Sequence, residues 1–160
     1  MKVRTGFVSN SSSSSYVIKL IKSEPCPTCG RSNPNIVDHI QGRSYYYDDE
    51  TGVDYDSKEA VLKDIAADID DAKTRLEGFF KLKPNEVPPE YQRWGCKTTA
   101  EEFIIDTHEE LRRLHERYRT ISAIDGEVYG IRISYHDEHV QHIFDQGVEE
   151  GSIEVIEDRN

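Results

Sequence analysis

The feature that most constrains the fold is a segment in which apolar side chains recur every three or four residues. The side chains that follow this spacing are Val61, Ile65, Ile69, Ala72, Leu76, Phe79 and Phe80. This period is typical of an amphipathic α-helix, so we expect one long helix whose apolar stripe is buried in the core. Asp56 and Glu59, three residues apart, predict the start of that helix, and Lys83-Pro84 predicts its end.

A second segment repeats the helical spacing further along the chain. Its apolar residues are Ile104, Leu111, Leu114, Tyr118 and Ile121. Thr98 and Thr99, followed by Glu101 and Glu102, indicate a capped helix N-terminus. Because only a proline-containing loop separates the two segments, we expect the helices to pack as an antiparallel pair.

The remaining apolar segments are short and indicate β-strands. Residues 129–135 alternate between apolar and small or polar side chains, and residues 16–21 and 153–156 are rich in Val and Ile. We also expect short strands at residues 36–40 and 45–47, and a turn whose tip is Thr51-Gly52. A short helix over residues 137–146 is expected to end at Gly147.

Strands at both ends of the chain with helices between them predict an α+β fold. We expect a small, mainly antiparallel sheet packed against the pair of long antiparallel helices. A chain of 160 residues has the length of one ordinary domain, so residues 16–160 are assigned to a single domain and residues 1–15 to a serine-rich N-terminal arm.

The charge balance bears on the class of partner. The chain carries 31 acidic and 20 basic residues, a formal net charge of −11. Such a surface repels phosphate backbones, so a nucleic-acid partner is not expected, and a protein with a basic region is favoured. We expect no membrane association, because the sequence lacks an apolar stretch of about 20 residues. With three cysteines and no apolar signal segment, we expect a cytoplasmic protein.

Cys26-Pro-Thr-Cys29-Gly30 is the clearest chemical motif. Two thiolates separated by two residues hold a Zn²⁺ ion readily, and the following glycine lets the backbone turn toward the sulfur atoms. A tetrahedral site needs two more ligands. We favour Cys96 and His39, which predicts a structural zinc site made of Cys26, Cys29, Cys96 and His39.

Other interpretations of the cysteines stay open. All three can be reduced and unligated, with Cys96 a small buried side chain. A thioredoxin-like redox role needs a helix that begins at the first cysteine, and Asn33-Pro34 opposes such a helix. Histidines near the C-terminus, His136, His139 and His142, are alternative zinc ligands.

The same histidines also suggest a metal-dependent hydrolase. His136, His139 and His142 are spaced three residues apart, which on a helix places them on neighbouring positions. The spacing differs from His-Glu-x-x-His, and Val140, Ile143 and Phe144 supply a buried face opposite, so these histidines are interpreted first as surface residues. The acidic run at residues 48–52 lacks the order of a calcium-binding loop.

The N-terminal arm carries a specific sequence pattern. Arg4-Thr5-Gly6-Phe7-Val8-Ser9-Asn10 is followed by five serines and Tyr16-Val17-Ile18. This run resembles an N-terminal signature of uncharacterised bacteriophage and prophage proteins, in which Phe is usual where this chain has Tyr16. The resemblance covers residues 4–18 alone. It implies a phage-associated origin, hence the host cytoplasm or the virion as location, and it implies no activity and no site residue.

These observations favour a non-enzymatic, phage-associated accessory protein. It would bind another protein through its acidic surface, and a zinc site would stabilise one of its loops. A virion or assembly component that uses the N-terminal arm is the first alternative. The metal-dependent hydrolase built on the histidine cluster is the second.

Overall fold

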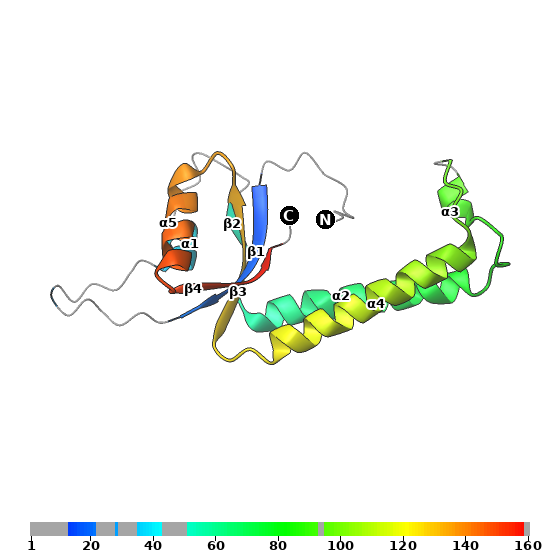
Figure 1. Cartoon of the computed structure of the whole chain (residues 1–160), viewed down its shortest axis with the longest axis horizontal. Coiled ribbons are helices and arrows are strands. Elements are labelled where there is room, and N and C mark those ends of the chain that lie inside the picture. The colour runs from blue at the N-terminus through cyan, green and yellow to red at the C-terminus, as the bar shows by residue number, and fades with distance from the viewer. Residues whose placement is uncertain (1–12, 22–27, 29–34, 43–50, 93–94, 159–160) are drawn as a thin grey trace. The chain divides into compact units, whose positions relative to one another are not determined.

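The computed structural model describes residues 13–21, 28, 35–42, 51–92 and 95–158. The chain divides into two compact units, which are described one at a time. The sheet unit comprises Met1–Lys58 and Asp125–Asn160, and the helix unit comprises Glu59–Ile124 (Figure 1). The predicted α+β class, with an antiparallel sheet, is confirmed. A single domain over residues 16–160 stays a prediction.

The sheet unit contains a four-stranded antiparallel sheet of order β2-β3-β1-β4. The strands are β1 (Ser13–Leu20), β2 (Gly52–Tyr55), β3 (Glu127–Ser134) and β4 (Ile153–Asp158). β1 is central and pairs with β3 over its whole length, from Ser13 opposite Ser134 to Leu20 opposite Glu127. β2 and β4 are therefore the two edge strands.

The N-terminal arm ends earlier than we expected from the sequence. We expected the arm to reach residue 15, but β1 begins at Ser13, and Ser14 lies opposite Ile133 with 3% of its surface exposed. A sheet ladder is formed by backbone groups, so serines extend a strand when a long partner strand is available. Composition alone favoured a linker because it contains no information about that partner.

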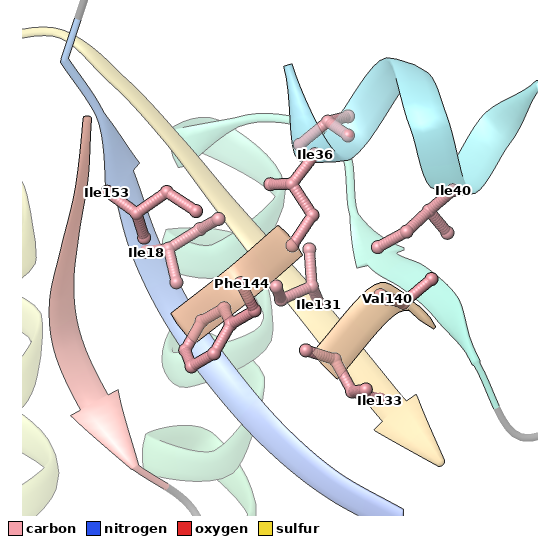
Figure 2. Close-up of a cluster of buried hydrophobic side chains, with 9 residues drawn as sticks. Ile18, Ile36, Ile40, Ile131, Ile133, Val140, Phe144 and Ile153 are labelled. Carbon is pink, nitrogen blue, oxygen red and sulfur yellow. The ribbon is translucent and has the colours of Figure 1, made fainter. Parts of the chain in front are cut away.

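Helices α1 (Ile36–Gln41) and α5 (Glu138–Glu149) supply the apolar residues that meet one face of the sheet. Ile36 and Ile40 of α1, and Val140 and Phe144 of α5, join Ile18 and other strand residues in a buried cluster (Figure 2). Burial of this apolar surface is the main stabilising contribution to the sheet unit.

The predicted strand at residues 36–40 is wrong, because these residues form α1. The Asn35 side chain caps the helix by accepting a hydrogen bond from the Val37 amide at 2.9 Å. Ile36, Val37 and Ile40 share the buried side. Packing of that side against the core cluster outweighs the strand preference of β-branched residues. The predicted strand at residues 45–47 lies outside the described residues.

Three boundaries in the sheet unit also differ from the prediction. Gly52 is the first residue of β2 rather than the tip of a turn. β3 ends at Ser134, which leaves Tyr135 60% exposed. α5 continues past Gly147 to Glu149, and at Gly147 an added Cβ would lie 2.5 Å from Cδ1 of Ile153. Gly147 is therefore a close-packing position within the helix and not a helix end.

The helix unit contains α2 (Lys58–Phe79), α3 (Pro89–Gln92) and α4 (Ala100–Ser122). Thr99 and Glu102 form the expected capping box at the start of α4. Phe79, buried at the end of α2, stacks on Phe103 with ring centroids 5.1 Å apart. Arg75 donates to Glu110 at 2.8 Å. Phe80, expected in the core, follows α2 and is 61% exposed.

In the part of the chain that the structure describes, no helix combines the length and apolar character needed to cross a membrane.

Candidate functional site

His39 is the one predicted zinc ligand that the structure describes within the sheet unit. It lies in the last turn of α1 and is partly buried. Its ring meets that of His139 on α5 edge to face, with ring centroids 5.1 Å apart. Contact between α1 and α5 therefore brings together two imidazoles that are 100 positions apart in the sequence. Cys26 and Cys29, the proposed knuckle, lie outside the described residues.

Cys96 belongs to the helix unit, in the turn between α3 and α4. It is partly exposed, so the interpretation as a buried apolar side chain is wrong. The preceding Gly95 has a φ of 68°, a left-handed conformation that glycine adopts without strain. Hydrogen bonds with the side chain and then the backbone of Thr98 lower the pKa of the Cys96 thiol. A lowered pKa favours the thiolate, the form that reacts and binds metal.

The histidine cluster does not form a three-ligand group. His136 lies before α5, whose N-cap is Asp137, and His139 and His142 lie in its first two turns. All three side chains are exposed. Within the described ranges there is no group of three or more His, Cys, Asp or Glu side chains arranged to hold a metal ion. The contact that the structure does show for this cluster is the pairing of His139 with His39.

A surface rich in acidic residues covers α5 and β4. Between residues 137 and 158 the sequence has no Lys or Arg. It has eight carboxylates there: Asp137, Glu138, Asp145, Glu149, Glu150, Glu154, Glu157 and Asp158. Six of these side chains are exposed, and Asp137 and Glu157 are partly buried. We call these eight residues the α5–β4 acidic surface. Lys19 of β1 reaches it, with Nζ 3.7 Å from Glu154 Oε2.

A helix cap, a close-packed glycine and a tight turn connect α5 to β4 in this surface. Asp137 caps α5 by accepting a hydrogen bond from the Val140 amide at 3.2 Å. The absence of a side chain at Gly147 lets Ile153 pack against the helix. α5 therefore turns directly into β4 through Gly151, which has a φ of 75°. The acidic residues of the helix and of the edge strand thus belong to one continuous hairpin-like segment.

Several acidic residues of the helix unit have cationic partners. Arg75 bridges Asp71 and Glu110, with N to O distances of 3.0 and 2.8 Å. Arg112 and Arg113 both bind Glu109, at 2.9 and 3.0 Å. The hydrogen bond from Arg112, followed in size of effect by that from Arg113, lowers the pKa of Glu109 to about 2. Opposite charges three or four residues apart on a helix pair in this way.

Sequence reasoning missed two features of this region. The proximity of His39 and His139 required knowledge that residues 36–41 form a helix. Asn35 as a cap and Gly42 after the last turn were signals for it. The acidic surface was missed because charge was counted over the whole chain. Counting by segment finds the run without Lys or Arg between residues 133 and 158.

No family model matches the chain, and the comparisons with curated proteins and with solved structures find no match.

Proposed function

We propose that this chain is a phage-associated, non-enzymatic accessory protein of the cytoplasm that binds a basic region of another protein through the α5–β4 acidic surface. The observation that carries the proposal is the local excess of acidic side chains along α5 and β4. Eight carboxylates without a Lys or Arg in their own segment leave a local negative potential. Such a potential accelerates association with a positively charged partner and selects against partners of like charge.

The same proposal includes a structural zinc ion held by the cysteine knuckle. His39 was the predicted histidine ligand, and His139 lies against it, so the imidazole of either residue is available to the same ion. Two thiolates and two imidazoles are a common structural zinc set. In the proposal, the ion joins the segment that precedes α1 to the contact between α1 and α5. The antiparallel packing of α2 and α4 belongs to the proposal too, supported by the contacts Arg75–Glu110 and Phe79–Phe103.

Charge variants test the binding function. In Asp145→Asn/Glu149→Gln/Glu154→Gln, three charges are removed from the acidic surface. A matched control, Glu77→Gln/Glu90→Gln/Asp106→Asn, removes three charges from exposed positions of the helix unit. Both variants and the wild type are immobilised and incubated with bacterial lysate at about 50 mM salt, where electrostatic attraction is strong. We expect the same basic proteins to be retained by the wild type and the control and lost from the first variant. Equal retention by all three proteins would contradict the proposal.

Elemental analysis tests the zinc site. We expect one zinc per chain in the purified wild type, and loss of the metal in Cys26→Ser/Cys29→Ser. His39→Gln/His139→Gln should weaken zinc retention in a competition with chelator, because two of four ligands are removed. A Cys96→Ser variant decides whether Cys96 or His139 is the fourth ligand, because unchanged zinc retention in this variant would exclude Cys96. Metal-free wild-type protein would refute the zinc part and leave the charge experiment unaffected.

A further inference from the structure

The α5–β4 acidic surface ends in an edge of the sheet. β4 has β1 as its single strand neighbour among the described residues, and its other neighbour in the core is α5. β4 has six residues and the opposite edge strand, β2, has four, and each pairs with its neighbour through one register shift, at Val17/Ile18 of β1 and at Val53/Tyr55 of β2. β4 is therefore the longer edge along which a further strand could pair.

The backbone of β4 is oriented for that pairing. The Ser152 carbonyl accepts a hydrogen bond from the Ile21 amide at 2.9 Å, so it points toward the strand that contains β1. In an extended strand successive residues direct their backbone groups to opposite sides. The N–H and C=O groups of Ile153 and Val155 therefore point away from β1, to the outer edge of the sheet.

The two faces of β4 differ in chemistry at this edge. Glu154 lies opposite Lys19, and Glu157 lies opposite Val17, so both carboxylates are on one face. Val155 lies opposite Ile18 on the other face, the side of the core cluster, and is 38% exposed. A strand added here would meet carboxylates on one of its faces and an apolar side chain on the other.

A second copy of β4 would not satisfy this arrangement. Pairing two copies would place Glu154 and Glu157 near the same residues of the other chain, and like charges that face each other across strands are destabilising. A strand with Lys or Arg at alternate positions and apolar residues between them complements both faces.

We propose that the outer edge of β4 binds an extended segment of another protein by strand addition, and that this segment alternates cationic and apolar residues. The inference rests on the proposed function, because it names where and in what conformation the basic partner binds. Backbone hydrogen bonds along Ile153 and Val155 supply affinity, and the carboxylates select the cationic residues.

The probe is an octapeptide with blocked termini in which valine and lysine alternate, added to the full-length ¹⁵N-labelled chain. Amide hydrogen exchange is measured by NMR at about 50 mM salt. We expect the peptide to slow exchange of the Ile153 and Val155 amides about tenfold or more. A control peptide of the same sequence carries N-methyl groups on alternate amides, so it keeps the charge and lacks the donors needed for pairing. It should give no such protection.

Val155→Pro supplies a protein variant for the same test. Proline lacks the outward N–H group and is accepted on edge strands, so the variant should keep its spectrum elsewhere and lose the protection by the peptide. If this variant fails to fold, the comparison of the two peptides on the wild-type chain still decides the result.

Three outcomes would overturn the inference. Equal binding of the two peptides would show that charge alone attracts them, and protection along β2 in place of β4 would assign the other edge. Absence of peptide binding, when basic proteins are still retained in the lysate experiment, would refute strand addition and leave the proposed function intact. Loss of discrimination between the charge variants would refute the proposed function itself.

Discussion

The two units of this chain achieve order by different kinds of contact. In the helix unit, many of the side-chain bonds join residues three or four apart, such as Arg112 with Glu109 and Arg113 with Glu109. In the sheet unit, β1 is paired with β3, more than 100 positions later in the sequence, and nine buried residues from strands and helices form one cluster. Local contacts order the long helices, and distant contacts order the sheet.

The difference extends to charge. Several acidic residues of α2 and α4 pair with arginines of the same helix or of the other one, whereas those of α5 and β4 lie in a segment without Lys or Arg. Ion pairs on an exposed helix contribute little each, so their removal has small effects. The segment of α5 and β4 concentrates negative charge at exposed positions, which is why we assign it to binding.

The largest effect is expected when the same substitution is made at one glycine of each unit. At Gly130 of β3 an added Cβ would overlap the ring of Tyr55, and the Tyr55 Cγ and Cβ atoms would lie at 3.1 and 3.2 Å. Gly130→Ala should therefore lower the free energy of unfolding by about 1–3 kcal/mol. At Gly78 of α2 nothing lies within 4 Å of an added Cβ. Gly78→Ala should raise the free energy of unfolding by about 0.5–1 kcal/mol.

Urea unfolding followed by circular dichroism measures both changes. If both substitutions changed the free energy of unfolding in the same direction, the contrast between the two units would be contradicted, because the two glycines would then stand in similar surroundings.

A smaller effect is expected at the N-terminus of α4. The Thr99 hydroxyl accepts a hydrogen bond from the Glu102 amide, and the Glu102 carboxylate accepts from the Thr99 amide at 2.8 Å. Thr99→Ala removes one half of this box and should reduce the free energy of unfolding by about 1 kcal/mol. Thr74→Ala is the control, since that hydroxyl donates to the Asp70 carbonyl inside α2 and satisfies no helix end. A cost at Thr74 as large as at Thr99 would argue against capping as the cause.

The smallest effect is a pH dependence at Glu109. Its pKa is lowered from 4.5 to about 2 by Arg112 and Arg113, so the folded state binds the proton less tightly than the unfolded chain. The resulting stabilisation is fully present above pH 4.5 and is lost as the pH falls toward 2. Glu109→Gln should lower Tm by roughly 1–3 °C at pH 7 and by less at pH 2 to 3.

Thermal unfolding at the two pH values, with Glu90→Gln as control, checks this prediction. A Tm difference between Glu109→Gln and the wild type that is independent of pH would mean that the arginine bonds are not its origin.

Much of the helix unit was predictable from the sequence because its signals are local. Thr99 and Glu102 lie three positions apart and form the capping box as expected. The apolar spacing placed Val61, Ile65 and Ile69 on one buried side, and all three are buried. The prediction that Phe80 is buried was wrong because α2 ends one residue earlier, at Phe79. An apolar repeat does not show at which residue a helix ends.

The candidate site was less predictable. His39 is the histidine nearest to Cys26 and Cys29 in sequence, while its neighbour in space is His139. Nothing within a few residues of either histidine specifies that contact. It follows from the packing of α1 and α5 in one core cluster, and the β-branched residues of α1 by themselves favour a strand. The acidic run, by contrast, was present in the sequence and needed only to be counted by segment.

The sequence by itself determined the α+β class, the long helices with the cap of α4, and the excess of negative charge, because periodicity, capping and composition act over a few residues or over the whole chain. Only the tertiary structure decided that serines begin the central strand, that His39 lies against His139, and that β4 is an edge. Each of these depends on a partner supplied by a distant segment. A strand is central or at an edge according to what lies beside it, and that relation is absent from any local stretch of residues.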